Sequence, residues 1–220
     1  MTAEEADTAN TAGDADTAGD SGAAIGAGTA IEAGAVAAKR TWRRQLLAAR
    51  RALAPEVVAG AGPALAQRVL ALPEARGATC VAGYVELPGE PPTGALLAAL
   101  LDRETRVLLP RQAAVALDFV EWDGGPLGAG GHGTRAPAHG SVRPLSDAQI
   151  VVTPALAVDQ RGVRLGRGGG GYDRALAQAA AGALVVALLW DGELVARLPA
   201  EPHDRPVAAV VSPARTVRLA

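Results

Sequence analysis

The spacing of apolar residues predicts several helices and strands, and the clearest helical pattern begins at residue 39. Within residues 39–53 (KRTWRRQLLAARRAL), Trp42, Leu46 and Leu53 recur near the spacing of one helix face. Pro55 follows shortly afterwards, and proline is common just beyond the end of a helix. The sequence therefore predicts an amphipathic helix over these residues.

The remaining elements are shorter. Three further helices are expected at residues 63–72, at 93–103 with Thr93 as the N-cap, and at 172–181. Strands are expected at residues 79–85, 106–109, 116–122, 150–152 and 183–190, with edge strands at 206–211 and 216–219. Residues 124–140 are so rich in Gly, Pro and His that we expect a long surface loop there.

Two of the expected strands carry no polar alternation. The runs IVV at 150–152 and ALVVALLW at 183–190 are apolar throughout, which is typical of parallel strands covered by helices on both faces. The predicted fold class is therefore α/β: a single three-layer α/β/α domain with a mostly parallel sheet, spanning residues 39–220.

The first 38 residues differ in composition from the rest of the chain. They are mostly Ala, Thr, Gly and Asp, with seven acidic residues and no Lys or Arg. Such a segment lacks the apolar content that offsets ordering entropy, so residues 1–38 are predicted to be a disordered acidic tail. Residues 39–220 then hold all 21 basic and 16 acidic residues, a formal charge of +5. This excess suits a pocket that neutralises several phosphates, but it is too small to require a nucleic-acid partner.

The sequence favours a cytoplasmic protein without a membrane partner. The longest apolar run, residues 183–190, is far shorter than the roughly 20 residues that a membrane-spanning helix needs. The acidic start of the chain also lacks the positive charge and apolar stretch of a secretory signal. Cys80 is the single cysteine, so it cannot form an internal disulfide, and its apolar surroundings predict a buried thiol.

A glycine-rich segment carries the strongest chemical signal. In residues 161–174 (RGVRLGRGGGGYDR), five glycines and Arg167 lie between Leu165 and a predicted helix. Glycines let backbone amides approach a ligand closely, and Arg164 and Arg167 add positive charge and forked donors. The segment is therefore expected to hold phosphate, although a flexible basic turn is the plainer alternative.

Two other functions fit parts of the same segment. Gly166, Gly168 and Gly171 satisfy the G-x-G-x-x-G pattern of a Rossmann-type NAD-binding oxidoreductase, and Asp191 follows the next strand at a suitable distance for a ribose contact. Against this, residues 153–165 separate the glycines from the preceding strand. A non-catalytic RNA-binding module would use repeated Arg-Gly units, whereas only one such unit is present.

Four segments together resemble the 5-formyltetrahydrofolate cyclo-ligase family, also called methenyltetrahydrofolate synthetases. The segments are KRTWR at 39–43, GYVELPGEPPT at 83–93, TPALAVDQRG followed by RLGRGGGGYDR within 153–174, and EPHDRPVAAVV at 201–211. The resemblance implies an enzyme that uses ATP and Mg²⁺ to convert 5-formyltetrahydrofolate into 5,10-methenyltetrahydrofolate, releasing ADP and phosphate after phosphorylation of the formyl oxygen. It also implies a reduced folate and ATP as partners, and we expect a monomer or a weak homodimer.

The resemblance also implies a role for individual positions. The ATP-binding residues would be Lys39, Arg40, Arg43, Arg164, Gly166, Arg167, Gly168, Gly169, Gly170, Gly171 and Tyr172. The folate-binding residues would be Val85, Glu90, Arg167, Gly168, Gly169, Gly170 and Gly171. Arg167 would be catalytic, and Asp173 and Asp204 would bind the metal, although for Asp173 the sequence alone allows a helix N-terminal charge equally well.

Three positions depart from the family pattern. Gly171 stands where a first tyrosine is usual before Tyr172, Ala155 replaces a usual glycine, and Val158 replaces an aromatic residue before Asp159. The first of these changes removes one aromatic surface from the expected folate pocket.

Overall fold

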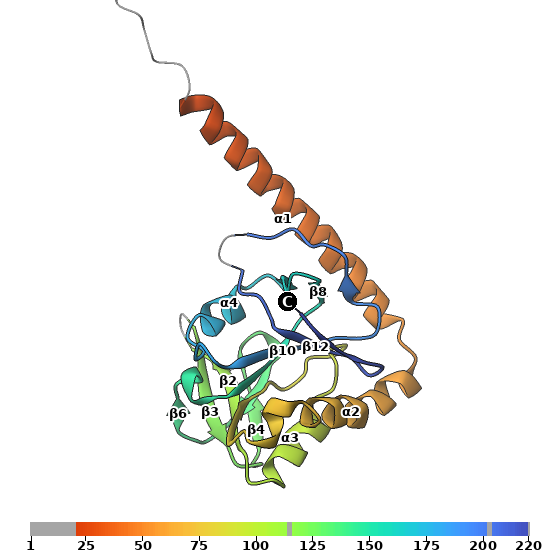
Figure 1. Ribbon diagram of the computed structural model, residues 1–220, viewed down its shortest axis with the longest axis vertical. Helices are drawn as coiled ribbons and strands as arrows, with labels where there is room; N and C mark the ends of the chain where they lie inside the picture. The colour runs from red at the N-terminus through yellow and green to blue at the C-terminus, as the bar shows by residue number, and fades with distance from the viewer. Residues whose placement is uncertain (1–20, 114–115, 202–203, 220) are drawn as a thin grey trace, which may run out of the picture.

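The computed structural model describes residues 21–113, 116–201 and 204–219 (Figure 1). These residues form an eight-stranded sheet with helices on both faces. In spatial order its strands are β13 (Thr216–Arg218), β12 (Ala209–Val211), β10 (Leu184–Leu188), β7 (Ile150–Pro154), β1 (Cys80–Ala82), β2 (Arg106–Gln112), β3 (Leu117–Trp122) and β6 (Val142–Arg143). The predicted α/β fold class is confirmed.

The middle of the sheet is parallel and its edges are antiparallel. Strand β7 pairs in parallel with β1 and β10, and parallel pairing extends outward to β2 and β12. Strands β3, β6 and β13 are antiparallel to their neighbours. Four consecutive residues of β7, Ile150–Thr153, are buried, as the lack of polar alternation in that run predicts.

One face of the sheet is covered by α2 (Pro55–Leu70) and α3 (Gly94–Leu101). Leu65 of α2 and Leu96 of α3 are fully buried and share one core cluster with Val81 and Ile150 of the sheet. Gly62 of α2 is buried and faces Pro92 and Ala95 at the start of α3, which places the two helices side by side.

The other face carries a more varied layer. Strand residues Cys80, Leu108 and Val151 pack there against Ala175 and Leu176 of α4 (Gly171–Leu176). The thiol of Cys80 is buried, as predicted, and its burial raises its pKa.

A small sheet lies beside α4. It consists of β11 (Leu194–Val195), β8 (Ala157–Asp159) and β9 (Arg164–Leu165). Trp42 and Leu46 of α1 (Ser21–Arg51) pack against the buried residues of this small sheet. The predicted apolar face of the amphipathic helix therefore contacts the domain. Figure 1 shows the N-terminal half of α1 projecting away from the domain.

Several predicted boundaries differ from the structure. Helix α1 begins at Ser21, whereas the apolar pattern predicts a helix from residue 39. The helix includes residues 21–38 of the predicted tail, residues 1–20 lie outside the described residues, and the division of the chain into a tail and a domain at residue 38 stays a prediction. Helix α2 begins at Pro55 instead of residue 63, and α4 ends at Leu176 instead of residue 181.

The expected surface loop at 124–140 also contains regular structure. Strands β4 (Leu127–Ala129) and β5 (Arg135–Pro137) pair antiparallel, joined by a short 3₁₀ turn at Gly131–Gly133. Gly133 takes a positive φ of 76°, which the tight connection requires and which glycine adopts without strain. Glycines therefore mark a hairpin turn here, not an irregular loop.

Candidate functional site

A cavity of about 440 Å³ opens beside the carboxyl ends of the central parallel strands. Its wall includes Tyr84 after β1, Gln112 at the end of β2, and Ala155 after β7. Ligands of open α/β sheets commonly bind at this end of the strands. The predicted site residues that line the cavity are Lys39, Arg43, Val85, Glu90, Arg164, Gly166, Arg167, Gly168, Gly169, Gly170, Gly171, Tyr172, Asp173 and Asp204. Arg40 is exposed and does not line it, so the structure gives no support for an ATP contact at that position.

The glycine loop, residues 166–171, connects β9 to α4 and forms one wall of the cavity. Gly168 and Gly170 have φ values of 110° and 63°, which a side chain would make unfavourable. The carbonyl of Gly166 accepts a hydrogen bond of 2.9 Å from Arg43 Nε, which ties the loop to α1. A Cβ atom at Gly168 would lie 3.4 Å from the Arg43 guanidinium carbon, so the absence of a side chain keeps the loop close to this cation.

The loop does not have the setting of a dinucleotide-binding fingerprint. Strand β9, which precedes the glycines, pairs antiparallel with β8 in the small sheet and is not a strand of the main parallel sheet. Asp191 accepts hydrogen bonds from the Ser212 hydroxyl and the Ala214 amide instead of facing the loop. The Rossmann interpretation is therefore not supported.

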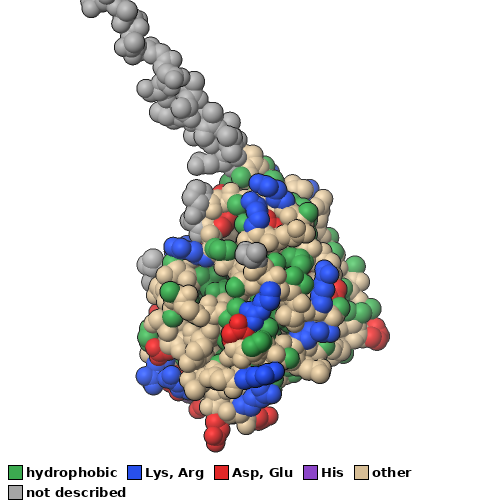
Figure 2. Space-filling view, viewed as in Figure 1, with side chains coloured by type: hydrophobic (Ala, Val, Ile, Leu, Met, Phe, Trp, Pro, Cys, Tyr) green, Lys and Arg blue, Asp and Glu red, His purple; other side chains and the backbone are tan. Residues whose placement is uncertain are grey.

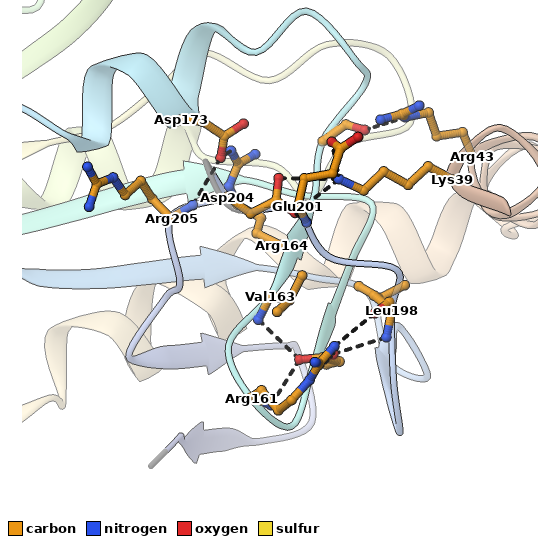
Figure 3. Close-up of polar contacts among 12 residues, drawn as sticks. Lys39, Arg43, Arg161, Val163, Arg164, Asp173, Leu198, Glu201, Asp204 and Arg205 are labelled. Atoms are coloured by element: carbon orange, nitrogen blue, oxygen red, sulfur yellow. Dashed lines mark hydrogen bonds and ion pairs between the residues drawn. The ribbon is translucent and has the colours of Figure 1, made fainter. Parts of the chain in front are cut away.

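Lys39 of α1 lies between two carboxylates at the edge of the cavity (Figure 3). Its ammonium nitrogen is 2.7 Å from Glu201 Oε2 and 3.0 Å from Asp204 Oδ2. The Lys39 side chain is only 7% exposed, so these short contacts hold it in a partly desolvated position. The structure thus brings a predicted ATP ligand and a predicted metal ligand into direct contact, and adds Glu201, which the motif comparison did not single out.

Arg164 and Asp173 both line the cavity and contact each other. The guanidinium of Arg164 donates a 2.8 Å hydrogen bond to Asp173 Oδ1, and the Arg164 side chain is 3% exposed. It also lies 5.7 Å from the centre of the Tyr172 ring, within the range of a cation–π contact. Arg164 lines the cavity and contacts Asp173 and Tyr172, and its predicted contact with phosphate stays a prediction.

Two polar atoms at this point are buried without a hydrogen-bond partner in the described part of the chain. They are Nε of Arg164 and the hydroxyl of Tyr172. Burial, and secondly the negative charge of Glu90, raises the pKa of Tyr172 well above its usual range, so the phenol stays protonated. A buried, unsatisfied donor in a cavity wall is uncommon and indicates a place where a ligand could supply the missing acceptor.

Glu90 and Arg167 both line the cavity and form an ion pair there. Arg167 Nε donates a 2.9 Å hydrogen bond to Glu90 Oε1, and Glu90 Oε2 accepts from the amide of Leu87 at 3.0 Å. The Glu90 side chain is 6% exposed, whereas that of Arg167 is 40% exposed. Arg167, the one long charged side chain of the glycine loop, therefore contacts the segment that follows β1.

The missing tyrosine at position 171 has a structural counterpart. A Cβ atom on Gly171 would lie 3.6 Å from Leu117 Cδ1, and Leu117 also lines the cavity. Leu117 of β3 therefore supplies an apolar surface next to Gly171.

A buried ion pair that the sequence did not reveal fastens α1 to the domain. Arg50 donates to both carboxylate oxygens of Glu193, at 2.7 and 2.8 Å, and also to the carbonyl of Ala155. Burial raises the pKa of Glu193, and the Arg50 contact opposes that change. Because Lys39 and Arg43 lie on the same helix, this pair helps to set their position in the cavity.

Asp159 organises the turn that precedes the glycine loop. Its fully buried carboxylate accepts hydrogen bonds from the amides of Arg161, Val163 and Leu198, and from the Arg161 guanidinium (Figure 3). Burial alone would raise the pKa of Asp159, but these hydrogen bonds outweigh it and lower the pKa. The aspartate seen within TPALAVDQRG is thus a structural support of the loop.

The fold and the cavity define a class: an α/β protein with a glycine loop and converging cations suited to a phosphate-bearing ligand. Comparisons with known proteins narrow this class. The sequence model of the 5-formyltetrahydrofolate cyclo-ligase family matches residues 35–213 of this chain. The chain belongs to that family, which confirms the resemblance drawn from its motifs.

Individual relatives agree with this assignment. A 5-formyltetrahydrofolate cyclo-ligase of Mycolicibacterium smegmatis is 41% identical over 145 residues, covering 62% of this chain and 75% of the relative. One from Escherichia coli is 34% identical over 183 residues, covering 76% of this chain and 95% of the relative. The solved structure of a 5,10-methenyltetrahydrofolate synthetase from Aquifex aeolicus matches with a TM-score of 0.72 at 27% identity, covering 82% of this chain and 92% of that one.

Proposed function

We propose that this protein catalyses the ATP-dependent cyclisation of 5-formyltetrahydrofolate to 5,10-methenyltetrahydrofolate. The observation that carries the proposal is the continuity of the cavity: the glycine loop and Arg43 line the same space as Val85 and Glu90. The two reactants can therefore meet within one cavity. Family membership supports both of them as substrates.

The reaction explains why the cavity is rich in cations. A formamide oxygen is a poor leaving group, so the formyl oxygen first attacks the terminal phosphorus of ATP, and the bond to ADP breaks. The second folate nitrogen then attacks the formyl carbon, and phosphate leaves with the former formyl oxygen. Such phosphoryl transfer needs alignment and charge neutralisation more than a protein nucleophile.

Arg167 is the residue that we assign to the transferred phosphoryl group. It lies in the middle of the glycine loop, its side chain reaches into the cavity, and its guanidinium is accessible. A guanidinium aligned with a phosphoryl group stabilises the charge that develops in the transition state. Lys39, Arg43 and the glycine-loop amides contribute to holding the phosphates.

We assign a Mg²⁺ ion to Asp173 and Asp204. Both line the cavity, and their segments meet where the amide of Arg205 donates to Asp173 Oδ1 (Figure 3). No cluster of three or more metal-binding side chains occurs among the described residues. Two carboxylates still fit Mg²⁺, because this ion is usually held by one or two carboxylates together with substrate phosphates and water. When bound, it would neutralise phosphate charge.

The folate is assigned to the part of the cavity between Val85, Glu90 and Tyr172. Glu90 accepts hydrogen bonds from the pterin amino-type donors. Tyr84 is buried, and burial followed by the charge of Glu90 raises its pKa, so this ring and that of Tyr172 present neutral surfaces beside the carboxylate. Apolar side chains such as Leu117 complete the wall.

The remaining assignments concern partners and location. No helix among the described residues is long and apolar enough to cross a membrane. On the face shown in Figure 2, basic side chains are scattered among acidic and neutral ones, which does not favour a nucleic-acid partner. We assign the protein to the cytoplasm, as a monomer or weak homodimer, and sedimentation at several concentrations would test the oligomeric state.

The proposed activity is tested by following the absorbance of the methenyl product with purified protein. Product should form only when ATP, Mg²⁺ and 5-formyltetrahydrofolate are all present. No product, together with no protection from thermal unfolding by the folate, would contradict the proposal. Tight NAD(H) binding without ATP would instead favour the dehydrogenase interpretation.

A further inference from the structure

The Glu90–Arg167 ion pair joins the two halves of the cavity. Arg167 is the long charged side chain of the glycine loop, and Glu90 belongs to the segment that follows β1. The pair directly joins a residue that we assign to the phosphates with a residue that we assign to the folate. A ligand that displaces one member from this contact would also remove the partner of the other.

Glu90 is the rigid member of the pair. Its Oε2 accepts from the amide of Leu87 at 3.0 Å, and its own amide donates to the carbonyl of Leu87 at 2.9 Å. The neighbouring carbonyl of Gly89 accepts from the indole nitrogen of Trp190 at 3.0 Å. These contacts hold the carboxylate at a fixed point of the wall.

Arg167 is the movable member. Gly166 and Gly168 flank it, and Gly168 has a φ of 110°, so the backbone on both sides lacks side chains that would restrict it. The Arg167 side chain is 40% exposed, and its guanidinium donates to Glu90. Loss of that contact would leave the guanidinium able to turn toward a phosphate.

We propose that Glu90 holds Arg167 as an internal counter-ion, and that folate binding at Glu90 releases Arg167 to the nucleotide, so that the two substrates bind cooperatively. This inference rests on the proposed function. The pterin donors compete with Arg167 for the Glu90 carboxylate, and the released guanidinium then meets the terminal phosphate. By reciprocity, a bound nucleotide must strengthen folate binding by the same factor. Glu90 is thus a positioning residue for Arg167 as well as a folate contact.

The test is a double-mutant cycle on nucleotide affinity, measured by calorimetry with a non-hydrolysable ATP analogue and Mg²⁺. Four proteins are compared without folate: wild type, E90Q, R167Q and E90Q/R167Q. We expect E90Q alone to bind the analogue about 5-fold or more tightly than wild type, which is the lower end of typical allosteric coupling. In the R167Q background, E90Q should leave the affinity for the analogue unchanged, because Glu90 then has no Arg167 guanidinium to hold.

The cycle separates this mechanism from simple repulsion. If Glu90 only repelled phosphate through space, E90Q would tighten binding equally in both backgrounds, and that result would overturn the proposal, as would an unchanged affinity in E90Q. The matched control is E86Q, since Glu86 lies in the same segment, bonds to Thr93 and does not line the cavity. It should bind the analogue as wild type does.

In a further experiment, the affinity of the wild-type protein for the analogue is measured in the presence of saturating 5-formyltetrahydrofolate. The affinity for the analogue should rise by a factor similar to that produced by E90Q, and an unchanged or reduced affinity would contradict cooperative binding. Failure of the proposed function gives a different result, because wild-type protein would then bind neither the analogue nor the folate.

Discussion

The buried pair between Arg50 and Glu193 should contribute strongly to the stability of the protein. The two side chains are 2% and 8% exposed, and both guanidinium–carboxylate contacts are shorter than 3 Å. Replacing Arg50 by Met leaves the carboxylate buried without its partner, which costs about 3–5 kcal/mol. With a urea m-value of about 2 kcal/mol per molar, the unfolding midpoint should fall by roughly 1.5–2.5 M.

The assay is urea unfolding followed by circular dichroism, with R51M as the matched control. Arg51 is the next residue of the same helix but is exposed, so its replacement should change stability by no more than about 0.5 kcal/mol. The double variant R50M/E193M should recover most of the loss, because it leaves no unpaired buried charge. The reasoning would be refuted if the free energies of unfolding of R50M and R51M differed by less than about 1 kcal/mol.

The same substitution should also affect the site. Helix α1 carries Lys39 and Arg43 to the cavity, and Arg50 fastens its C-terminal end to the body of the domain. Loosening this end should therefore raise the KM for ATP more than it lowers kcat. An unchanged KM in a destabilised R50M protein would show that Trp42 and Leu46 alone hold the helix in place.

Three further predictions concern the loop and the turn that supports it. R167A should reduce kcat by about 100-fold or more in a protein that remains folded; near-normal turnover would remove Arg167 from the proposed chemistry. G168A should weaken binding of an ATP analogue, because φ at this position is 110° and the new Cβ would contact Arg43. An unchanged affinity in calorimetry would argue against this loop geometry. Asp159 has a lowered pKa in the folded protein, so its contribution to stability is complete above the unfolded value of about 4 and is lost as the pH falls below it. Urea unfolding of D159N should show a weaker dependence on acid pH than wild type, and identical pH profiles would exclude this role.

The sequence was informative where a local pattern alone determines the structure. The apolar runs that became β7 and β10 have no polar alternation, and burial on both faces follows directly. The glycine loop and its flanking arginines were also visible, because close approach of backbone to ligand demands glycine at consecutive positions.

The sequence was less informative where distant residues determine the structure. Arg50 and Glu193 are 143 positions apart, and nothing in their local patterns distinguishes them from exposed charges. The contact between Arg164 and Asp173 could not be predicted for the same reason, because it depends on how β9 meets α4. Helix α1 also extends further toward the N-terminus than the apolar pattern indicates, because the Ala- and Gly-rich residues 21–38 have no apolar periodicity that marks a helix.

The central claim is that the cavity brings the terminal phosphoryl group of ATP to the formyl oxygen of the folate. It can be tested with 5-formyltetrahydrofolate carrying ¹⁸O in the formyl group, by mass spectrometry of the inorganic phosphate released after turnover. The proposed reaction predicts one ¹⁸O atom in each phosphate molecule. Unlabelled phosphate, formed at the same rate as the methenyl product, would contradict it.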